Sequence, residues 1–134
     1  MNGDGYSDVV AGDWRTNIGG NSNAGVAMIF HGSATGLNTV PATILEGPPQ
    51  ANAWFGRSVS TAGDVNGDGY GDILIGATTF SSGHTNEGAA FLYLGSPTGI
   101  PTTFFFRYES NINGANMGES VSTAGDVNGD GYSD

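Results

Sequence analysis

Oxygen-bearing side chains recur at alternate positions of one nine-residue stretch. Its first, third, fifth and ninth positions carry Asp64, Asn66, Asp68 and Asp72, and the backbone carbonyl of Tyr70 is available at the seventh. Such donors on a curled backbone suit Ca²⁺, a hard cation that takes roughly six to eight oxygen ligands. The stretch therefore predicts a calcium loop, with Gly69 permitting the sharp reversal of the chain.

Other metals and other calcium motifs fit this stretch less well. It contains neither Cys nor His, which argues against Zn²⁺, and Mg²⁺ prefers fewer protein ligands with retained water. An EF-hand would need Glu at the twelfth position, where Ile75 stands in an apolar run. The loop is thus expected to lead into a strand.

The same pattern occurs three times. The copy at 126–134 is complete, whereas the copy at 2–8 begins at the third position with Asn2, and its first position would fall before Met1. Isolated Asn-Gly and Asp-Gly pairs can be simple turn formers, but clustered carboxylates without a cation would have raised pKa values and would cost stability. The repeated clusters therefore favour metal ligation. The further predicted ligands are Asp126, Asn128, Asp130, Tyr132 and Asp134, and, in the incomplete copy, Asn2, Asp4, Tyr6 and Asp8.

The three copies belong to a longer internal repeat. SVSTAGDVNGDGY stands at 58–70 and again, identically, at 120–132, and the Asp motifs are spaced 64 and 62 residues apart. Self-similarity of this length predicts repeated structural units. We divide the chain into units at 2–65 and 66–127, followed by a duplicated loop segment at 128–134, all within one domain.

Four short apolar runs alternate with turns in each unit. They are predicted as strands at 57–63, 72–76, 89–94 and 102–108, with a polar loop at 78–87. Four strands in about 62 residues, repeated, are typical of β-propeller blades, in which each sheet buries both faces against its neighbours. The expected fold class is all-β, built of four-stranded antiparallel propeller blades.

The strand ends resemble a known family, the FG-GAP repeats of integrin α-subunit propellers and related bacterial extracellular proteins. Phe55-Gly56 matches the FG, and Gly76-Ala77-Thr78 matches the GAP with Thr in place of Pro, on either side of the calcium loop. Met117-Gly118 and Ala11-Gly12-Asp13 depart from the pattern, so those strand ends are expected to pack differently.

The resemblance implies an integrin-α-like propeller with structural calcium, an extracellular or cell-surface location, and a role in adhesion or protein binding rather than catalysis. Carbohydrate binding, as in lectins with similar repeats, and an accessory domain of an extracellular enzyme remain the alternatives. Trp14, Trp54 and Tyr108 could stack against a sugar, although packing between blades explains them as well.

Charge and composition exclude several partners. The net charge is −10 with three Arg and no Lys, so nothing could neutralise a row of phosphates or an anionic membrane surface. No long apolar segment and no basic-then-apolar leader is present, so neither a membrane span nor a signal peptide is expected. There is no Cys and therefore no disulfide.

Two repeats are too few to close a propeller ring. We therefore expect a homo-oligomer, in which three or four chains complete a ring of six or eight blades. The remaining polar residues indicate no catalytic site: His31 and His84 lie at a strand end and in a loop, and Glu46, Glu109 and Glu119 lie near turns outside any shared motif.

Overall fold

Seven β-strands and no helix make up the computed structural model, which describes residues 1–134. The strands are β1 (Val9–Asp13), β2 (Val26–Phe30), β3 (Thr43–Glu46), β4 (Phe55–Gly63), β5 (Asp72–Ala77), β6 (Ala89–Tyr93) and β7 (Phe106–Glu109). The all-β prediction is confirmed. No segment forms a helix long and apolar enough to cross a membrane.

The second sheet is a complete antiparallel blade with strand order β4-β5-β6-β7. The Asp motif connects β4 to β5, where the sequence analysis placed it. The fourth predicted strand, 102–108, was too long, because β7 begins only at Phe106. Before it, Phe105 N–H reaches Leu92 O at 2.8 Å, and residues 102–104 lie outside the strand, with the chain bent at 102 and 103.

The first sheet has three strands in the order β1-β2-β3, so the expected four strands per blade are found only in the second sheet. Residues 120–125 repeat the sequence of 58–63 in β4 but form no strand. They run beside β4, where Ser58 donates its hydroxyl to Gly118 O at 2.7 Å and Thr123 donates to Ala62 O at 3.2 Å.

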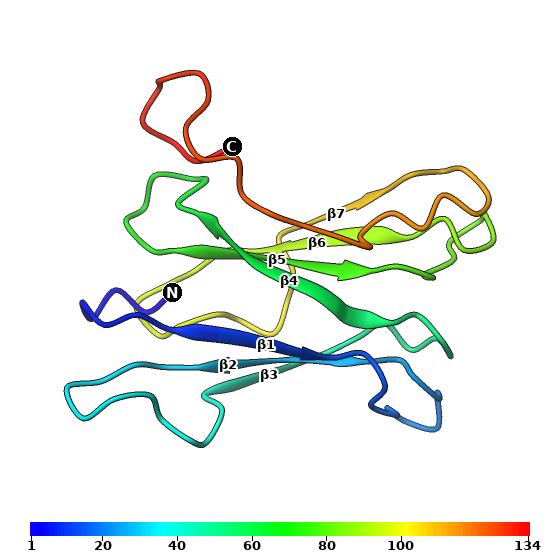
Figure 1. Ribbon diagram of the computed structural model, residues 1–134, viewed down its shortest axis with the longest axis horizontal. Helices are drawn as coiled ribbons and strands as arrows, with labels where there is room; N and C mark the ends of the chain where they lie inside the picture. Colours follow the sequence, from blue (N-terminus) through cyan, green and yellow to red (C-terminus); the bar gives the residue numbers. More distant parts are fainter.

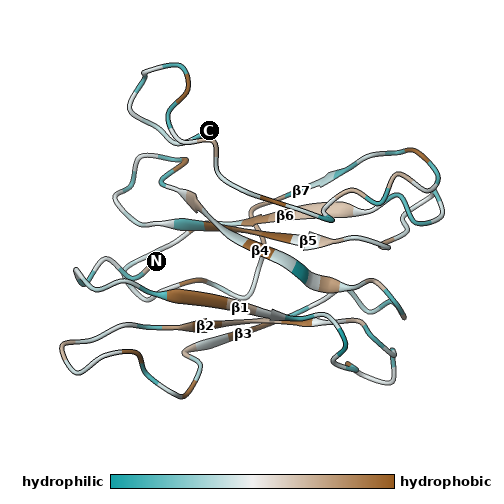
Figure 2. Ribbon diagram, in the orientation of Figure 1, coloured by the Kyte–Doolittle hydropathy of each residue, from teal (hydrophilic) through white to brown (hydrophobic).

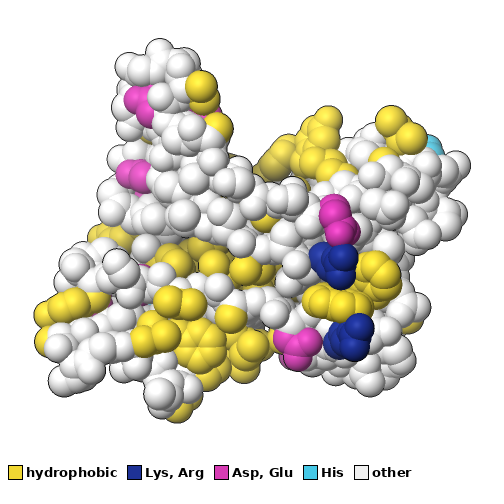
Figure 3. Space-filling view, viewed as in Figure 1, with side chains coloured by type: hydrophobic (Ala, Val, Ile, Leu, Met, Phe, Trp, Pro, Cys, Tyr) yellow, Lys and Arg dark blue, Asp and Glu magenta, His cyan; other side chains and the backbone are white.

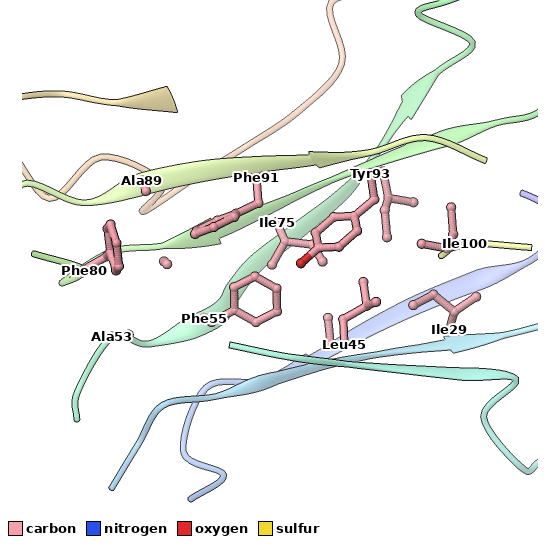
Figure 4. Packing of buried hydrophobic residues seen from close by; sticks show 13 residues of the cluster. Ile29, Leu45, Ala53, Phe55, Ile75, Phe80, Ala89, Phe91, Tyr93 and Ile100 are labelled. Atoms are coloured by element: carbon pink, nitrogen blue, oxygen red, sulfur yellow. The ribbon is translucent and has the colours of Figure 1, made fainter. Parts of the chain in front are cut away.

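The two sheets stack face to face and enclose the core (Figure 1). Leu45 and Ile29 project from one sheet toward Ile75, Phe91 and Tyr93 of the other, as Figure 4 shows. Figure 2 shows hydrophobic segments on the strands and hydrophilic ones in most loops. Each large side chain that is fully buried here stabilises the fold by roughly 1.5–3 kcal/mol.

Side-chain alternation leaves one apolar face exposed on each sheet. The side chains of residues paired across neighbouring strands point to the same side of a sheet. The register therefore shows which side chains form the outward face of each sheet, and we call this face the leading face on the first sheet and the trailing face on the second. Exposed hydrophobic side chains are visible in Figure 3. The leading face consists of Val9, Ala11, Met28, Phe30 and Ile44, and the trailing face of Leu74, Ala90, Leu92, Phe106 and Tyr108.

The three Asp motifs lie at the same end of the molecule. In Figure 1 they are the blue, green and red loops on the left. Figure 3 shows acidic side chains on the lobe formed by the last of them. The fold thus gathers three acidic loops that are 62 or 64 residues apart in sequence.

Candidate metal centre

The loop at 64–72 is curled by backbone amides that donate to its own side chains. Gly67 and Asp68 donate to Asp64 Oδ1 at 2.8 and 3.1 Å, and Gly69 donates to Asp64 Oδ2 at 2.8 Å. Asp68 N–H also reaches Asn66 Oδ1 at 3.2 Å, and Tyr70 N–H reaches Asp68 Oδ1 at 2.9 Å. The donors predicted at alternate positions therefore share one tight turn.

Asp72 ties this loop to the blade. Its carboxylate is fully buried and accepts Val65 N–H at 2.9 Å and Gly95 N–H, beyond the end of β6, at 2.7 Å. Burial raises the pKa of Asp72, the two amides oppose that rise, and the charges of Asp68 and Asp64 add to it. The negative charges of Asp68 and Asp64 thus act on this buried carboxylate, and no ion pair with a cationic side chain offsets them.

The loop at 126–134 repeats this hydrogen-bond pattern. Gly129 and Asp130 donate to Asp126 Oδ1 at 2.7 and 3.1 Å, and Gly131 donates to Asp126 Oδ2 at 2.8 Å. Tyr132 N–H donates to Asp130 Oδ1 at 3.0 Å. The remaining bonds also correspond: Asp130 N–H to Asn128 Oδ1 at 2.9 Å and Val127 N–H to Asp134 Oδ2 at 2.9 Å.

The loop at 2–8 keeps only part of the pattern. Asp4 N–H reaches Asn2 Oδ1 at 3.3 Å and Tyr6 N–H reaches Asp4 Oδ1 at 3.0 Å. The Tyr6 amide and the Asn2 side chain hold the pKa of Asp4 below its ordinary value. Asn2 N–H also reaches Asp8 Oδ2 at 3.3 Å. Asp4 and Asp8 thus keep the fifth and ninth positions of the pattern.

Neighbouring loops are packed against each other. A side chain at Gly3 would collide with the Tyr70 ring, and one at Gly67 would collide with the Tyr132 ring. Ser133 joins the second and third loops, because its hydroxyl accepts Asp64 N–H at 3.2 Å and its N–H donates to Asp64 O at 2.9 Å. Sequence reasoning gave the tyrosines only a carbonyl ligand role. The Tyr that follows each Asp-Gly pair was the sequence feature that could have indicated this packing role.

The donor chemistry of the two complete loops fits calcium. Each offers carboxylate, amide and carbonyl oxygens within nine residues. No three acidic or histidine side chains converge into a metal cluster on their own. The amide and carbonyl oxygens would have to complete such a site, and the Asp64 and Asp126 oxygens, each already accepting amide protons, retain further lone pairs.

A family model described as FG-GAP repeat matches residues 55–93, which run from β4 through β6. Integrin alpha-PS5 of Drosophila melanogaster is 32% identical over 140 residues, and integrin alpha-4 of Xenopus laevis is 30% identical over 138 residues. Each alignment covers 100% of this chain and 13% of the relative. The chain belongs to the FG-GAP repeat family.

A third relative matches over a shorter region. Integrin alpha-V of Gallus gallus is 40% identical over 77 residues, which cover 55% of this chain and 7% of that protein. The FG-GAP chain therefore spans only a small part of the length of its relatives.

The FG and GAP glycines touch each other across neighbouring FG-GAP units. A side chain at Gly12 would collide with the backbone of Gly56, and one at Gly76 would collide with the backbone of Gly118. Gly56 and Gly118 have nearly equal positive φ values, 81° and 82°. The altered copies, Met117-Gly118 and Ala11-Gly12-Asp13, keep the glycine that makes the contact, but their neighbours pack differently, because Met117 is half-buried outside any strand whereas Phe55 begins β4 and is fully buried.

Trp14 and Trp54 pack across the two repeats. Their ring centroids are 5.1 Å apart, and the Arg57 guanidinium lies 5.3 and 5.6 Å from the two rings. Arg57 also pairs with Glu119, with Nη2 2.7 Å from Oε1. Tyr108 does not join them, because it lies on the trailing face, opposite Ala90.

Glu109 and His84 are held in separate local contacts, whereas His31 Nε2 is buried without a hydrogen-bond partner. Arg107 pairs with Glu109 at 2.5 Å, and His84 Nδ1 lies 3.6 Å from Glu87 Oε2. Glu87, which sequence reasoning treated only as the end of a polar loop, is fully buried. Burial alone would raise the pKa of Glu87, but amide donors from Ser82, His84 and Asn111, together with the His84 charge, lower it. It fastens the 82–87 loop to residue 111.

Proposed function

We propose that the chain is a calcium-binding interaction module in which Ca²⁺ stabilises the loops at one end of neighbouring blades. The observation that carries this proposal is the identical hydrogen-bond pattern around Asp64 and Asp126, each in a loop with oxygen donors at alternate positions. Asp64, Asn66, Asp68, Tyr70 and Asp72 would hold one ion, and their counterparts at 126–134 a second.

A bound Ca²⁺ would supply the positive charge that balances the clustered carboxylates. The contacts of Asp72 determine which parts of the fold such an ion would stabilise. Asp72 links the loop to Val65 N–H on one side and to Gly95 N–H on the other. Fixing Asp72 therefore fixes the β4–β5 connection against the end of β6. Calcium in this position has a structural role and no catalytic one.

Calorimetric titration tests the calcium proposal. The wild type is expected to bind two Ca²⁺ ions per chain, and the substitutions Asp68→Asn and Asp130→Asn should each remove or greatly weaken one of them. Asp4→Asn changes the matching position of the incomplete loop and serves as the control, with no effect on either site. Absence of calcium binding by the wild type, or unchanged binding in both loop variants, would refute the proposal.

An adhesion or protein-binding role is the biological function that the comparisons support best. The relatives that match the whole chain are named integrin alpha subunits, and the family resemblance implies contacts with other proteins outside the cell or at its surface. The acidic side chains considered for catalysis do not form a pair of their own, since Glu109 and Glu119 each face an arginine. We therefore propose a binding module and not an enzyme.

The 134-residue chain is also proposed to associate head to tail with copies of itself. The leading and trailing faces are related by the repeat to the two faces that already pack inside the chain: Leu92 of the trailing face corresponds to buried Ile29, and Met28 of the leading face to buried Phe91. The free faces are thus complementary by repeat symmetry. Successive copies would extend the same packing, and three or four would form a ring of six or eight blades.

Light scattering of face variants tests this association. The wild type should have three or four times the chain mass of 13.6 kDa. Ile44→Asp on the leading face and Phe106→Asp on the trailing face should each give monomers, because a charge would be buried in the contact. Val40→Asp, at an exposed position on neither face, is the matched control.

Mixing the two face variants sharpens the test. The Ile44→Asp chain keeps an intact trailing face and the Phe106→Asp chain an intact leading face, so a head-to-tail contact predicts a dimer from two monomeric variants. A wild type that stays monomeric over the whole accessible concentration range would refute the association.

A further inference from the structure

A pocket of about 330 Å³ opens between the two sheets. One side is formed where β3 ends, at Glu46 and the residues that follow it, and the other by β6 and the approach to β7. One wall thus belongs to the first sheet and the other to the second. The volume lies near the lower end of the range of about 300–1,000 Å³ found for small-molecule sites.

Aromatic rings form the apolar part of the wall. Phe91 lies between Phe55 and Phe104, with ring centroids 5.4 and 5.3 Å away and edge-to-face geometry on both sides. Tyr93 makes edge-to-face contacts with the same two rings at 6.5 and 6.4 Å. The four rings hold one another in place, and Phe104 is 41% exposed. The pocket therefore offers a rigid aromatic surface that a ligand can reach.

Several hydroxyl groups in the wall have no partner within the chain. Tyr93 is only 3% exposed, and its ring projects between the sheets in Figure 4. Burial raises the pKa of Tyr93 to about 12, and no hydrogen bond contributes to that rise. Thr102 and Thr103 line the opening. The fully buried side-chain atoms without a partner are His31 Nε2, Trp54 Nε1 and His84 Nδ1, so the Tyr93 oxygen is open to the pocket, and a ligand can exchange hydrogen bonds with it and with the two exposed threonines.

The pocket has no free positive charge. Glu46 and Arg107 lie in its wall, and the Arg107 guanidinium is already paired with Glu109, so the Glu46 carboxylate has no cationic partner of its own. An anionic ligand would find no free cation here. The lining thus combines aromatic faces and hydroxyl groups without a free cation.

From this lining we infer that the pocket binds a neutral pyranose ring. The C–H face of a sugar would pack on the exposed Phe104 ring, and its hydroxyl groups would exchange hydrogen bonds with Tyr93 and the two threonines. This site is separate from the Trp14–Trp54 pair, whose rings pack against each other and Arg57. It is also separate from the acidic loops, so it does not depend on the calcium proposal.

Saturation-transfer NMR tests the site with methyl glycosides of glucose, galactose, mannose and N-acetylglucosamine in calcium-containing buffer. At least one glycoside should bind the wild type. Phe104→Ala should weaken its binding about tenfold or more, and Tyr93→Phe, which removes one oxygen, should weaken it about threefold to tenfold. Phe105→Ala is the matched control, because Phe105 is 68% exposed and lies outside the wall.

Three results with the glycosides would overturn the inference, and a fourth comes from an apolar probe. The first three are no binding by any of the four glycosides, binding that survives both Phe104→Ala and Tyr93→Phe in folded protein, and binding that is abolished by Trp14→Ala but unaffected by the pocket variants. Cyclohexanol is included as an apolar probe. If it competes as strongly as the sugars do, the pocket recognises apolar surface only and the inference fails.

Discussion

Asp72 combines two tasks that conflict in the absence of a metal. It is fully buried and holds two backbone amides, yet burial and the neighbouring Asp68 and Asp64 charges raise its pKa. Its folded-state pKa lies above the unfolded value, so ionisation of Asp72 opposes folding. The metal-free fold therefore gains stability as the pH falls through the folded-state pKa and loses it as the pH rises again.

The direction of this pH dependence can be checked with Asp72→Asn, whose side chain cannot ionise. In chelator, the melting temperature of the wild type should rise relative to that of Asp72→Asn as the pH falls from neutral toward 3.8, the ordinary pKa of Asp. Thermal melts at a series of pH values measure the difference.

Asp4 provides a control in which the effect of pH on stability has the opposite direction. Its pKa is lowered, so its contribution is present above the unfolded-state value and is lost as the pH falls. The melting temperature of the wild type should therefore fall relative to that of Asp4→Asn as the pH is lowered. The same sign for both variants would contradict this assignment of the two carboxylates.

At this scale, the sequence was sufficient to group the loop donors, because their spacing within nine residues is a local property. It could not show that Tyr70 and Tyr132 pack on glycines of the preceding loop, since that contact joins residues more than 60 positions apart. The burial of Glu87 was missed for the same reason. Its partner at residue 111 is brought near only by the completed blade.

The segment SVSTAG shows how an element depends on its neighbours. At 58–63 it lies in β4, paired with β5, whereas at 120–125 the identical sequence forms no strand. Local preference is the same in both places, and the copy at 58–63 forms a strand in the ladder with β5. The repeat predicted the strand type correctly for this complete blade.

The glycine contacts between units explain the FG and GAP positions. Gly76 has no room for a side chain because the Gly118 backbone lies against it. Gly76→Ala should therefore destabilise the fold by roughly 1–3 kcal/mol, the usual cost of overpacking. Chemical denaturation measures this difference.

Gly114→Ala separates steric from conformational effects. Gly114 has a positive φ of 72° but open space around its Cα, so alanine there should cost only about 1 kcal/mol. A Gly76→Ala chain as stable as the wild type would contradict the close approach of neighbouring units.

Across the whole molecule, acidic loops and outward apolar faces occupy different parts of the surface. The acidic loops share one end, Trp14, Trp54 and Arg57 meet in a cluster that joins the two repeats, and each sheet keeps one apolar face outward. Repeat length and turn chemistry were enough to predict the all-β, blade-like architecture. The inter-blade pocket was beyond sequence reasoning, because its wall joins residues from Glu46 to Arg107 that no motif connects.

The central claim is that Ca²⁺ holds the loops of neighbouring blades, and the melting temperature with and without calcium tests it most directly. A ligand that binds only the folded state adds roughly 2.7 kcal/mol per site at a hundredfold excess over Kd. Two sites should therefore raise the melting temperature by about 20 °C relative to chelator. Asp64→Asn with Asp126→Asn should remove the increase. Equal melting temperatures of the wild type in calcium and in chelator would contradict the account.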